Sequence, residues 1–439
     1  MTRFVFNRLF LAGFAAFVSL LPLDALAQAN GDLRADRDAA LQRMIADPTD
    51  RDAMLAHASA SIRLREFEPA VSTLERVLDQ YPGEVGARLD LAIAYFALGA
   101  YPVADHHFAI LQDVSGLPSE TQRTIAQYRQ AIAERTAPSG FSGNVAVGVA
   151  YSTNATLRSD SPTVFSLGVP LTRAPGVGSD GDVGGLVSAR VEHRYDMNSP
   201  NGDTWFTELG FEALHFVDKR DGDFDGIFLR TGPSLSLDQF AFGPKLRPFV
   251  ELDTIFTGGD WLYSTAGVGV QFSDTLTSDW SIYGSFRSGY RWHELTDADG
   301  PVQRAVAGVI YRPTRDFKIR LSGLAALDNS QSDAVANLEL GGRIGADYDF
   351  DAGLAFAERK WRVSAYGQIL DRSFLDPDAA VDPTRERDDL DIRVGSSLTA
   401  HFVEGFYVKA ALDWLSRQSN IPQFEGDELL ISLSVGLDF

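Results

Sequence analysis

Apolar and polar residues alternate along the carboxy-terminal two thirds of the chain. The last segment is a clear case, with its apolar members on one parity: Leu429, Ile431, Leu433, Val435, Leu437 and Phe439. The residues between them are small or polar: Ser432, Ser434, Gly436 and Asp438. Successive side chains of a strand point to opposite faces, so the pattern predicts strands with one apolar and one polar face.

The alternation recurs in about fourteen segments between residues 138 and 439, each roughly ten to fourteen residues long. A soluble β-sandwich would alternate too, because its apolar face packs on a second sheet. The even number of segments and the contrast between long and short connections favour an all-β transmembrane barrel of antiparallel strands. The long connections, expected outside the cell, are residues 152–182, 218–226, 373–387 and 418–427. On the opposite side, residues 351–359 form an unexpectedly long connection.

The preceding segment, residues 28–137, has apolar residues at helical spacing. A shift of about 34 residues superposes similar residues, which is the offset of tetratricopeptide helix pairs. The superposed pairs are Leu55 with Leu89, Leu64 with Leu98, Phe67 with Tyr101, Ala70 with Ala104 and Leu74 with Phe108. We therefore predict a small all-α, tetratricopeptide-like domain. The concave surface of such repeats commonly binds a peptide or protein segment, and a structural spacer or plug is the alternative.

The first 27 residues have the features of a secretory signal peptide. Arg3 and Arg8 form a basic start, an apolar run follows, and Ala25 and Ala27 supply the small residues needed for cleavage after Ala27. The alternative is a retained anchor helix, for which the apolar run is short. A secreted barrel protein with a periplasmic helical domain, located in the cell outer membrane, is the expected product.

Net charge and cysteine content exclude several classes of function. The formal net charge is −21 and the sequence has no basic stripe, so nucleic acid is not an expected partner. The sequence contains no cysteine, which excludes disulfides, thiolate metal sites and a lipid-bearing cysteine.

The sequence also lacks a recognisable catalytic or metal site. The barrel histidines His193 and His401 are expected at the opposite rim from His215 and His293, and no nucleophile accompanies them. Residues 221–226 begin like a calcium loop, but Gly232 stands where the bidentate Glu is needed. We predict no catalytic residue, metal or cofactor, and a protein that is not an enzyme.

The polar parity of the predicted strands carries charges of both signs. The residues expected to face the lumen are Arg190, Glu192, Arg194, Glu251, Asp253, Arg287, Arg291, Arg343, Asp347, Asp391 and Arg393. Mixed charges can line a wet conduction path or crosslink the wall as salt bridges, and the sequence leaves both open.

The order of these parts resembles the surface lipoprotein assembly modifier (Slam) family. The stretch from Ser142 to Asn154 is similar to the glycine-rich opening of that family's barrel, which leads into a long first loop. Phe439 resembles the terminal aromatic signal that the barrel-assembly machinery reads in outer-membrane proteins. The resemblance covers nearly the whole mature chain and implies no catalytic residues.

The resemblance implies an outer-membrane translocon that helps deliver lipoproteins or related secreted proteins to the cell surface. Its expected partners are a client protein, outer-membrane lipid and the barrel-assembly machinery. Two other classes share parts of this organisation: an exporter of exopolysaccharide, which also joins periplasmic repeats to a barrel, and a small-solute porin.

Overall fold

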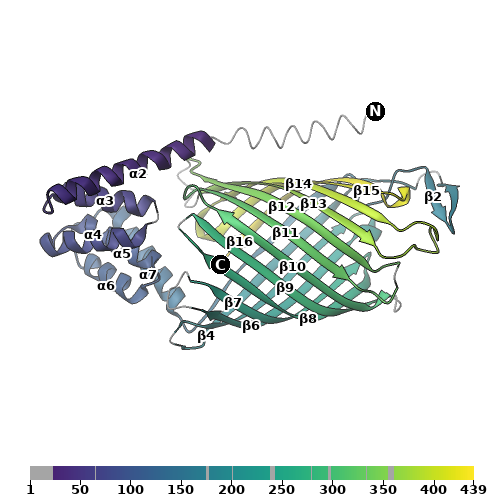
Figure 1. Ribbon diagram of the computed structural model, residues 1–439, viewed down its shortest axis with the longest axis horizontal. Helices are drawn as coiled ribbons and strands as arrows, with labels where there is room; N and C mark the ends of the chain where they lie inside the picture. Colours follow the sequence, from purple (N-terminus) through teal and green to yellow (C-terminus); the bar gives the residue numbers. More distant parts are fainter. Residues whose placement is uncertain are drawn as a thin grey trace.

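The computed structural model describes residues 23–64, 66–174, 177–199, 201–237, 243–277, 279–294, 298–332, 334–353 and 360–439, and consists of helices followed by a closed barrel (Figure 1). The predicted signal segment up to residue 22 lies outside these residues, and the predicted cleavage point after Ala27 falls within the first described helix. The helices are α2 (Leu23–Ala46), α3 (Arg51–Arg63), α4 (Phe67–Gln80), α5 (Val85–Ala97), α6 (Tyr101–Gln112) and α7 (Ser119–Thr136).

The helices form because their apolar residues recur at helical spacing and pack into two clusters. On α4, Ala70, Leu74 and Val77 are fully buried at intervals of four and three residues. Helix α5 ends where Gly99 adopts a φ of 73°, a left-handed conformation in which a side chain would be strained. None of the described helices is both long and apolar enough to cross a membrane.

The barrel contains fourteen antiparallel strands, and β1 closes it by pairing with both β4 and β16. This confirms the predicted class and strand number. The strands are β1 (Ser139–Ser152), β4 (Asp182–Asp196), β5 (Thr204–Phe216), β6 (Phe224–Ser236), β7 (Lys245–Thr257), β8 (Asp260–Thr275), β9 (Trp280–His293), β10 (Gly300–Tyr311), β11 (Phe317–Asp328), β12 (Asn337–Phe350), β13 (Trp361–Phe374), β14 (Asp388–His401), β15 (Phe406–Ser419) and β16 (Gly426–Asp438).

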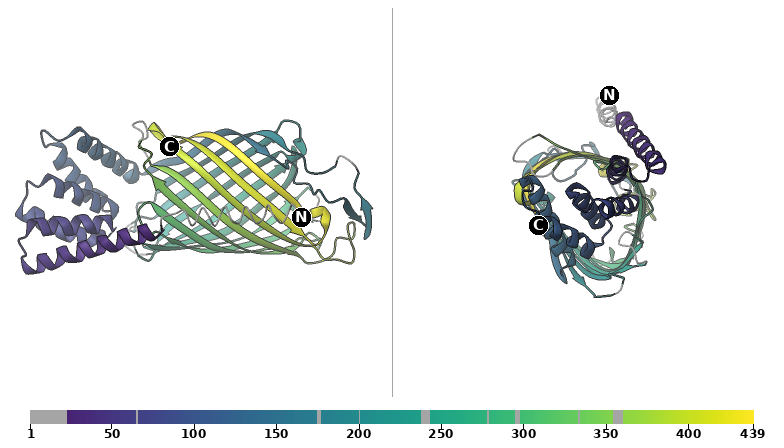
Figure 2. Two further views of the ribbon diagram at one scale, coloured as in Figure 1. Left: turned by 90° about the horizontal axis from the view of Figure 1, so that it is seen from above. Right: turned by 90° about the vertical axis from the view of Figure 1, so that its left-hand side faces the viewer.

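The helical domain lies at one open end of the barrel, and the end-on view of Figure 2 shows helices in front of that opening. Only Ala137 and Pro138 separate α7 from β1. Arg34 of α2 also reaches the turn between β8 and β9, with its Nη2 3.3 Å from Asp279 Oδ2. We call this end of the barrel the helical end and the opposite one the far end.

The long first connection carries structure of its own at the far end. It contains a hairpin of β2 (Thr163–Ser166) and β3 (Val169–Thr172), which the sequence did not predict. The hairpin turn donates backbone hydrogen bonds from Leu167 to Ala380 and from Gly168 to Val381, joining the first connection to that between β13 and β14. Residues 354–359 of the long connection predicted after β12 lie outside the described part of the chain.

The barrel exposes apolar side chains on its outer surface. On neighbouring strands the exposed large residues share one parity, as with Val250 and Leu252 on β7 and Val268 on β8. Val268 is 60% exposed and Phe286 on β9 is 50% exposed. The opposite parity carries the charged and polar side chains. An apolar outside and a polar inside are characteristic of barrels surrounded by lipid.

Candidate functional site: the barrel lumen

The lumen is lined by side chains that the strand register places on one face of neighbouring strands. Cross-strand partners point to the same side of a sheet, so each inward residue has inward partners on both neighbouring strands. Arg287 on β9, for example, is paired with Gly269 on β8 and with Arg304 on β10. The register thus determines which charges can meet.

A chain of ion pairs runs along the wall from β4 to β9. Arg230 on β6 approaches Glu208 at 3.7 Å and Glu251 at 3.0 Å, and Glu251 also approaches Arg287 at 3.3 Å. Arg190 on β4 approaches the same Glu208 at 2.7 Å. Glu251 is only 7% exposed and has a cation on each side, so its charge is compensated where it lies.

Further ion pairs join inward side chains around the rest of the lumen. The carboxylate of Asp347 receives Lys318 at 3.1 Å and Arg320 at 3.0 Å, together with a hydrogen bond from Ser364 Oγ. Arg417 donates two hydrogen bonds to Asp391, at 2.7 and 2.8 Å. The other pairs are Glu192 with Arg247, Asp328 with Arg291, Glu339 with Arg372, Asp349 with Arg362, and Asp389 with Arg387.

Aromatic rings cover several of the inward guanidinium groups. Arg247 lies 3.8 Å from the ring centroid of Phe206, and Arg343 lies 3.8 Å from that of Tyr366. The Tyr366 hydroxyl donates a hydrogen bond to Asp413 on β15. These contacts fix the long arginine side chains against the wall and limit how far they extend into the lumen.

The structure places all the predicted lumen residues on the parity opposite the exposed apolar side chains. One ion pair, between Glu251 and Arg287, joins two of them, and five others pair with charged residues outside the predicted set. Arg194 and Arg393 have different surroundings. Arg194 donates a hydrogen bond to the carbonyl oxygen of Ala137 in the link to the helical domain. Arg393 lies opposite Gln368 and Leu415 in the register and is exposed.

Sequence reasoning missed several charged residues that line the same wall: Glu208, Arg230, Arg304, Asp328, Arg372 and Arg417. Their inward parity was the available signal. On β10 this signal is weak, because Val302, Val306 and Ile310 share the parity of Arg304 while Ala305, Ala307 and Val309 occupy the other. Both faces of β10 are therefore largely apolar, and the charge of Arg304 does not by itself show which face is inward.

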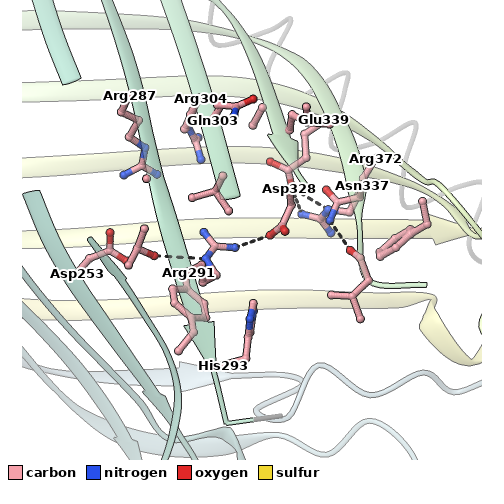
Figure 3. A pocket seen from close by; sticks show the side chains of 18 of the residues that line it. Asp253, Arg287, Arg291, His293, Gln303, Arg304, Asp328, Asn337, Glu339 and Arg372 are labelled. Carbon is pink, nitrogen blue, oxygen red and sulfur yellow. Dashed lines mark hydrogen bonds and ion pairs between the residues drawn. The ribbon is translucent and has the colours of Figure 1, made fainter. Parts of the chain in front are cut away.

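Two of the cavities in the described part of the lumen are similar in size. The cavity in the far half, which we call the far cavity, has a volume of about 450 Å³ (Figure 3). Its charged lining residues are Glu251, Asp253, Arg287, Arg291, Arg304, Asp328, Glu339, Arg372 and Arg387. The second cavity lies towards the helical end and has a volume of about 460 Å³. Its charged lining residues are Arg320, Arg343, Asp347, Lys409 and Asp413.

No group of three or more metal-ligating side chains occurs among the residues that the structure describes. His215 and His293 lie at far-end strand termini, whereas His193 and His401 lie near the helical end. His215 Nε2 is 3.0 Å from the Asp225 carboxylate, and no described Ser, Thr or Tyr side chain is hydrogen-bonded to His215. The described lumen is lined by charged side chains whose contacts are ion pairs and hydrogen bonds.

The helical domain offers a separate polar feature on α5. Burial raises the pKa of Asp90, and this carboxylate has no hydrogen-bond or ion-pair partner among the described residues. Nearby on the same helix, the Tyr95 hydroxyl donates a hydrogen bond to Glu75, and burial together with this bond raises the pKa of Tyr95 to about 12. Asp90 is therefore a partly buried carboxyl group on α5 to which no described residue is bonded.

No model of a known protein family matches the sequence, and no curated protein matches it either. Among solved structures, the barrel is similar to the outer-membrane channel DcaP of Acinetobacter baumannii, at 9% identity and a TM-score of 0.40, over 69% of this chain and 97% of that one. It is also similar to a Pseudomonas aeruginosa FadL homologue, at 11% identity and a TM-score of 0.39, over 68% and 90%. The helices are similar to the first tetratricopeptide domain of Spaghetti bound to an HSP90 peptide, at 22% identity and a TM-score of 0.22, over 25% and 94%.

Proposed function

We propose that this chain is a channel of the Gram-negative outer membrane, with its helical domain in the periplasm. The observation that carries the proposal is the closed barrel with exposed apolar side chains outside and ion-paired charges inside. A barrel without free edges can satisfy its backbone hydrogen bonds in lipid, and a charged interior retains water. The two cavities supply room for solutes within that interior.

Conductance of the purified full-length protein in planar bilayers tests this proposal. Stepwise insertion events with a reproducible ion current support a channel. A correctly folded barrel that inserts without any current, in symmetrical potassium chloride and over a range of voltages, contradicts it. Heat-modifiable migration on a gel verifies the fold independently of the current.

For the direction of traffic, we propose delivery of a lipoprotein or secreted protein to the cell surface, as the resemblance in domain order suggests. The position of the helical domain at one open end supports this, because a client bound there is held beside the lumen. Asp90 on α5 is available to pair with a cationic residue of such a client. The helical domain would capture the client, and the barrel would provide its exit or a folding template.

Protease shaving of intact cells with and without the gene, followed by mass spectrometry, tests the delivery proposal. A lipoprotein or secreted protein that disappears from the surface and accumulates inside supports delivery and identifies the client. An unchanged surface proteome contradicts it. Restoring the gene with Asp90→Asn then tests whether the carboxylate on α5 takes part in capture.

Passage of small solutes is the second candidate, and the size of the two cavities favours it. A volume of about 450 Å³ accommodates a small molecule and is far too small for a folded protein. Slower solute uptake in the deletion strain, with an unchanged surface proteome, would support this candidate over delivery. Reduced release of polysaccharide in that strain would instead support polymer export.

A further inference from the structure

The far cavity contains one arginine whose charge the wall does not neutralise. Arg304 on β10 lies directly opposite Arg287 on β9, and Arg291 lies four residues further along β9 on the same face (Figure 3). All three line the same cavity. Like charges directly opposite one another destabilise a sheet. An anion bound between Arg304 and Arg287 would reduce this repulsion.

The other arginines of the far cavity each have a carboxylate partner. Arg287 approaches Glu251 at 3.3 Å, and Arg291 approaches Asp328 at 2.7 Å. Arg372 and Arg387 approach their carboxylates at 2.5 Å, the partners being Glu339 and Asp389. Arg304 has neither a hydrogen bond nor an ion pair with any residue that the structure describes. Its five N–H donors are therefore free to bind a solute.

We infer that Arg304 is the centre of a binding site for small organic monocarboxylates inside the lumen. The inference rests on the proposed channel function and names the solute class that its far cavity accepts. A guanidinium presents a planar fork of donors that matches the two oxygens of a carboxylate. Arg287 and Arg291, each paired with a carboxylate, line the same cavity of about 450 Å³ beside that fork.

The acidic residue Asp253 limits how much negative charge the site accepts. It lines the same cavity, and no ion-pair partner within 4.0 Å is recorded for it among the described residues. Its charge, if ionised, would repel a second negative group on the solute. A single carboxylate on a small organic body therefore fits better than inorganic phosphate or a dicarboxylate.

Binding of butanoate and of inorganic phosphate to the purified full-length protein in detergent, measured by NMR line broadening, tests the site. Arg304→Gln removes the charge and the fork, and we expect butanoate affinity to fall about tenfold. Arg304→Lys keeps the charge without the fork and should give an intermediate loss. Arg393→Gln is the matched control, because it removes another inward arginine that lines neither of the two cavities, and should change the affinity less than twofold.

Unchanged butanoate affinity in Arg304→Gln overturns the inference. An equal loss of affinity in Arg393→Gln also overturns it, because the loss would then follow the total positive charge of the lumen and not the contact with Arg304. Tighter binding of phosphate than of butanoate overturns the assigned solute class. Bilayer recordings of the same proteins separate this inference from the channel proposal. Loss of butanoate binding in Arg304→Gln without any wild-type current would contradict the channel and leave the site standing.

Discussion

Phe108 of the helical domain is fully buried against its neighbours, whereas Phe286 of the barrel is half exposed on the outer surface. Charged residues show the reverse distribution. Arg43 and Arg51 lie on the surface of the helices, whereas Glu251 is almost completely buried inside the barrel. The helical domain thus buries apolar residues and exposes charged ones, whereas the barrel exposes apolar residues and buries charged ones.

The difference shows that burial follows the solvent of each region. In the helical domain, apolar side chains leave water and pack into a core. In the barrel, the apolar side chains are those that face lipid under the proposed function, and ion pairs compensate the charges of the interior. Substitutions of one type should therefore have unequal effects in the two regions.

The largest expected effect is that of Phe108→Ala in the helical core. Phe108 is fully buried and its ring stacks on Tyr128 with centroids 5.2 Å apart. We expect the helical domain to lose about 3–5 kcal/mol of unfolding free energy, because a cavity replaces the ring. Urea unfolding followed by limited proteolysis of the helical domain measures this loss.

The matched barrel variant is Phe286→Ala, which should affect stability much less, since lipid can fill the space of the lost ring. The barrel should keep its heat-modifiable migration in both variants. Equal destabilisation by the two substitutions would contradict the idea that Phe286 faces lipid.

The next effect in size is that of a charge on the outer surface at the middle of a strand. Val268 lies near the centre of β8 and is 60% exposed. In lipid vesicles, Val268→Arg should lower the unfolding free energy of the barrel by about 2–4 kcal/mol. Val103→Arg is the control on α6, where Val103 is 41% exposed to water and the change should be below about 0.5 kcal/mol.

A smaller effect is expected when an inward ion pair loses one charge. Arg387 donates two hydrogen bonds to the fully buried Asp389, at 3.0 and 2.5 Å. Asp389→Asn leaves the guanidinium without its counter-charge, which should cost on the order of 1–3 kcal/mol of barrel stability. Asp388→Asn changes the exposed neighbour on the other face of β14 and should be neutral in the same unfolding assay. Equal effects of the two variants would remove the distinction between the faces.

The smallest effect concerns the pH dependence of the helical domain. Burial lowers the pKa of His57, whose Nδ1 is 3.0 Å from Thr73 Oγ1, and burial also lowers the pKa of His107. The unfolded chain therefore binds more protons just below its histidine pKa of about 6.5. Stability from this source is complete above that pH and is lost as the pH falls through the folded pKa.

Thermal unfolding of the helical domain within the full chain, followed between pH 7.5 and 5, measures this dependence. His57→Gln should reduce the slope, with His107 accounting for a remaining part of it. A melting temperature that rises on acidification would show that the sign of the dependence is wrong.

Much of the barrel could be predicted because a period of two residues is visible in the sequence. On β16, Leu433 and Val435 alternate with small or polar residues, and the closed barrel contains the predicted number of strands. The register was not visible in the same pattern. The contact between Arg230 and Glu251 depends on which residues of β6 and β7 stand opposite each other, and this is set by turns and closure.

Contacts between distant segments were also beyond prediction. The backbone bond from Leu167 to Ala380 joins residues more than two hundred positions apart, and only closure of the barrel brings them together. The isolated charge of Arg304 was missed because both faces of β10 are mainly apolar. Alternation identifies a strand face only where the two faces differ in polarity.

Site-directed spin labelling tests the central claim, that lipid surrounds the barrel and water fills it, most directly. The chain contains no native cysteine, so single substitutions can be labelled without background. We would place the label by Val268→Cys and Phe286→Cys on the outer parity, and by Gln271→Cys and Ser285→Cys on the inner parity, in the full-length protein in vesicles. We expect oxygen dissolved in lipid to relax the outer pair and a water-soluble nickel complex to relax the inner pair. Equal access of the nickel complex to all four positions would contradict the central claim.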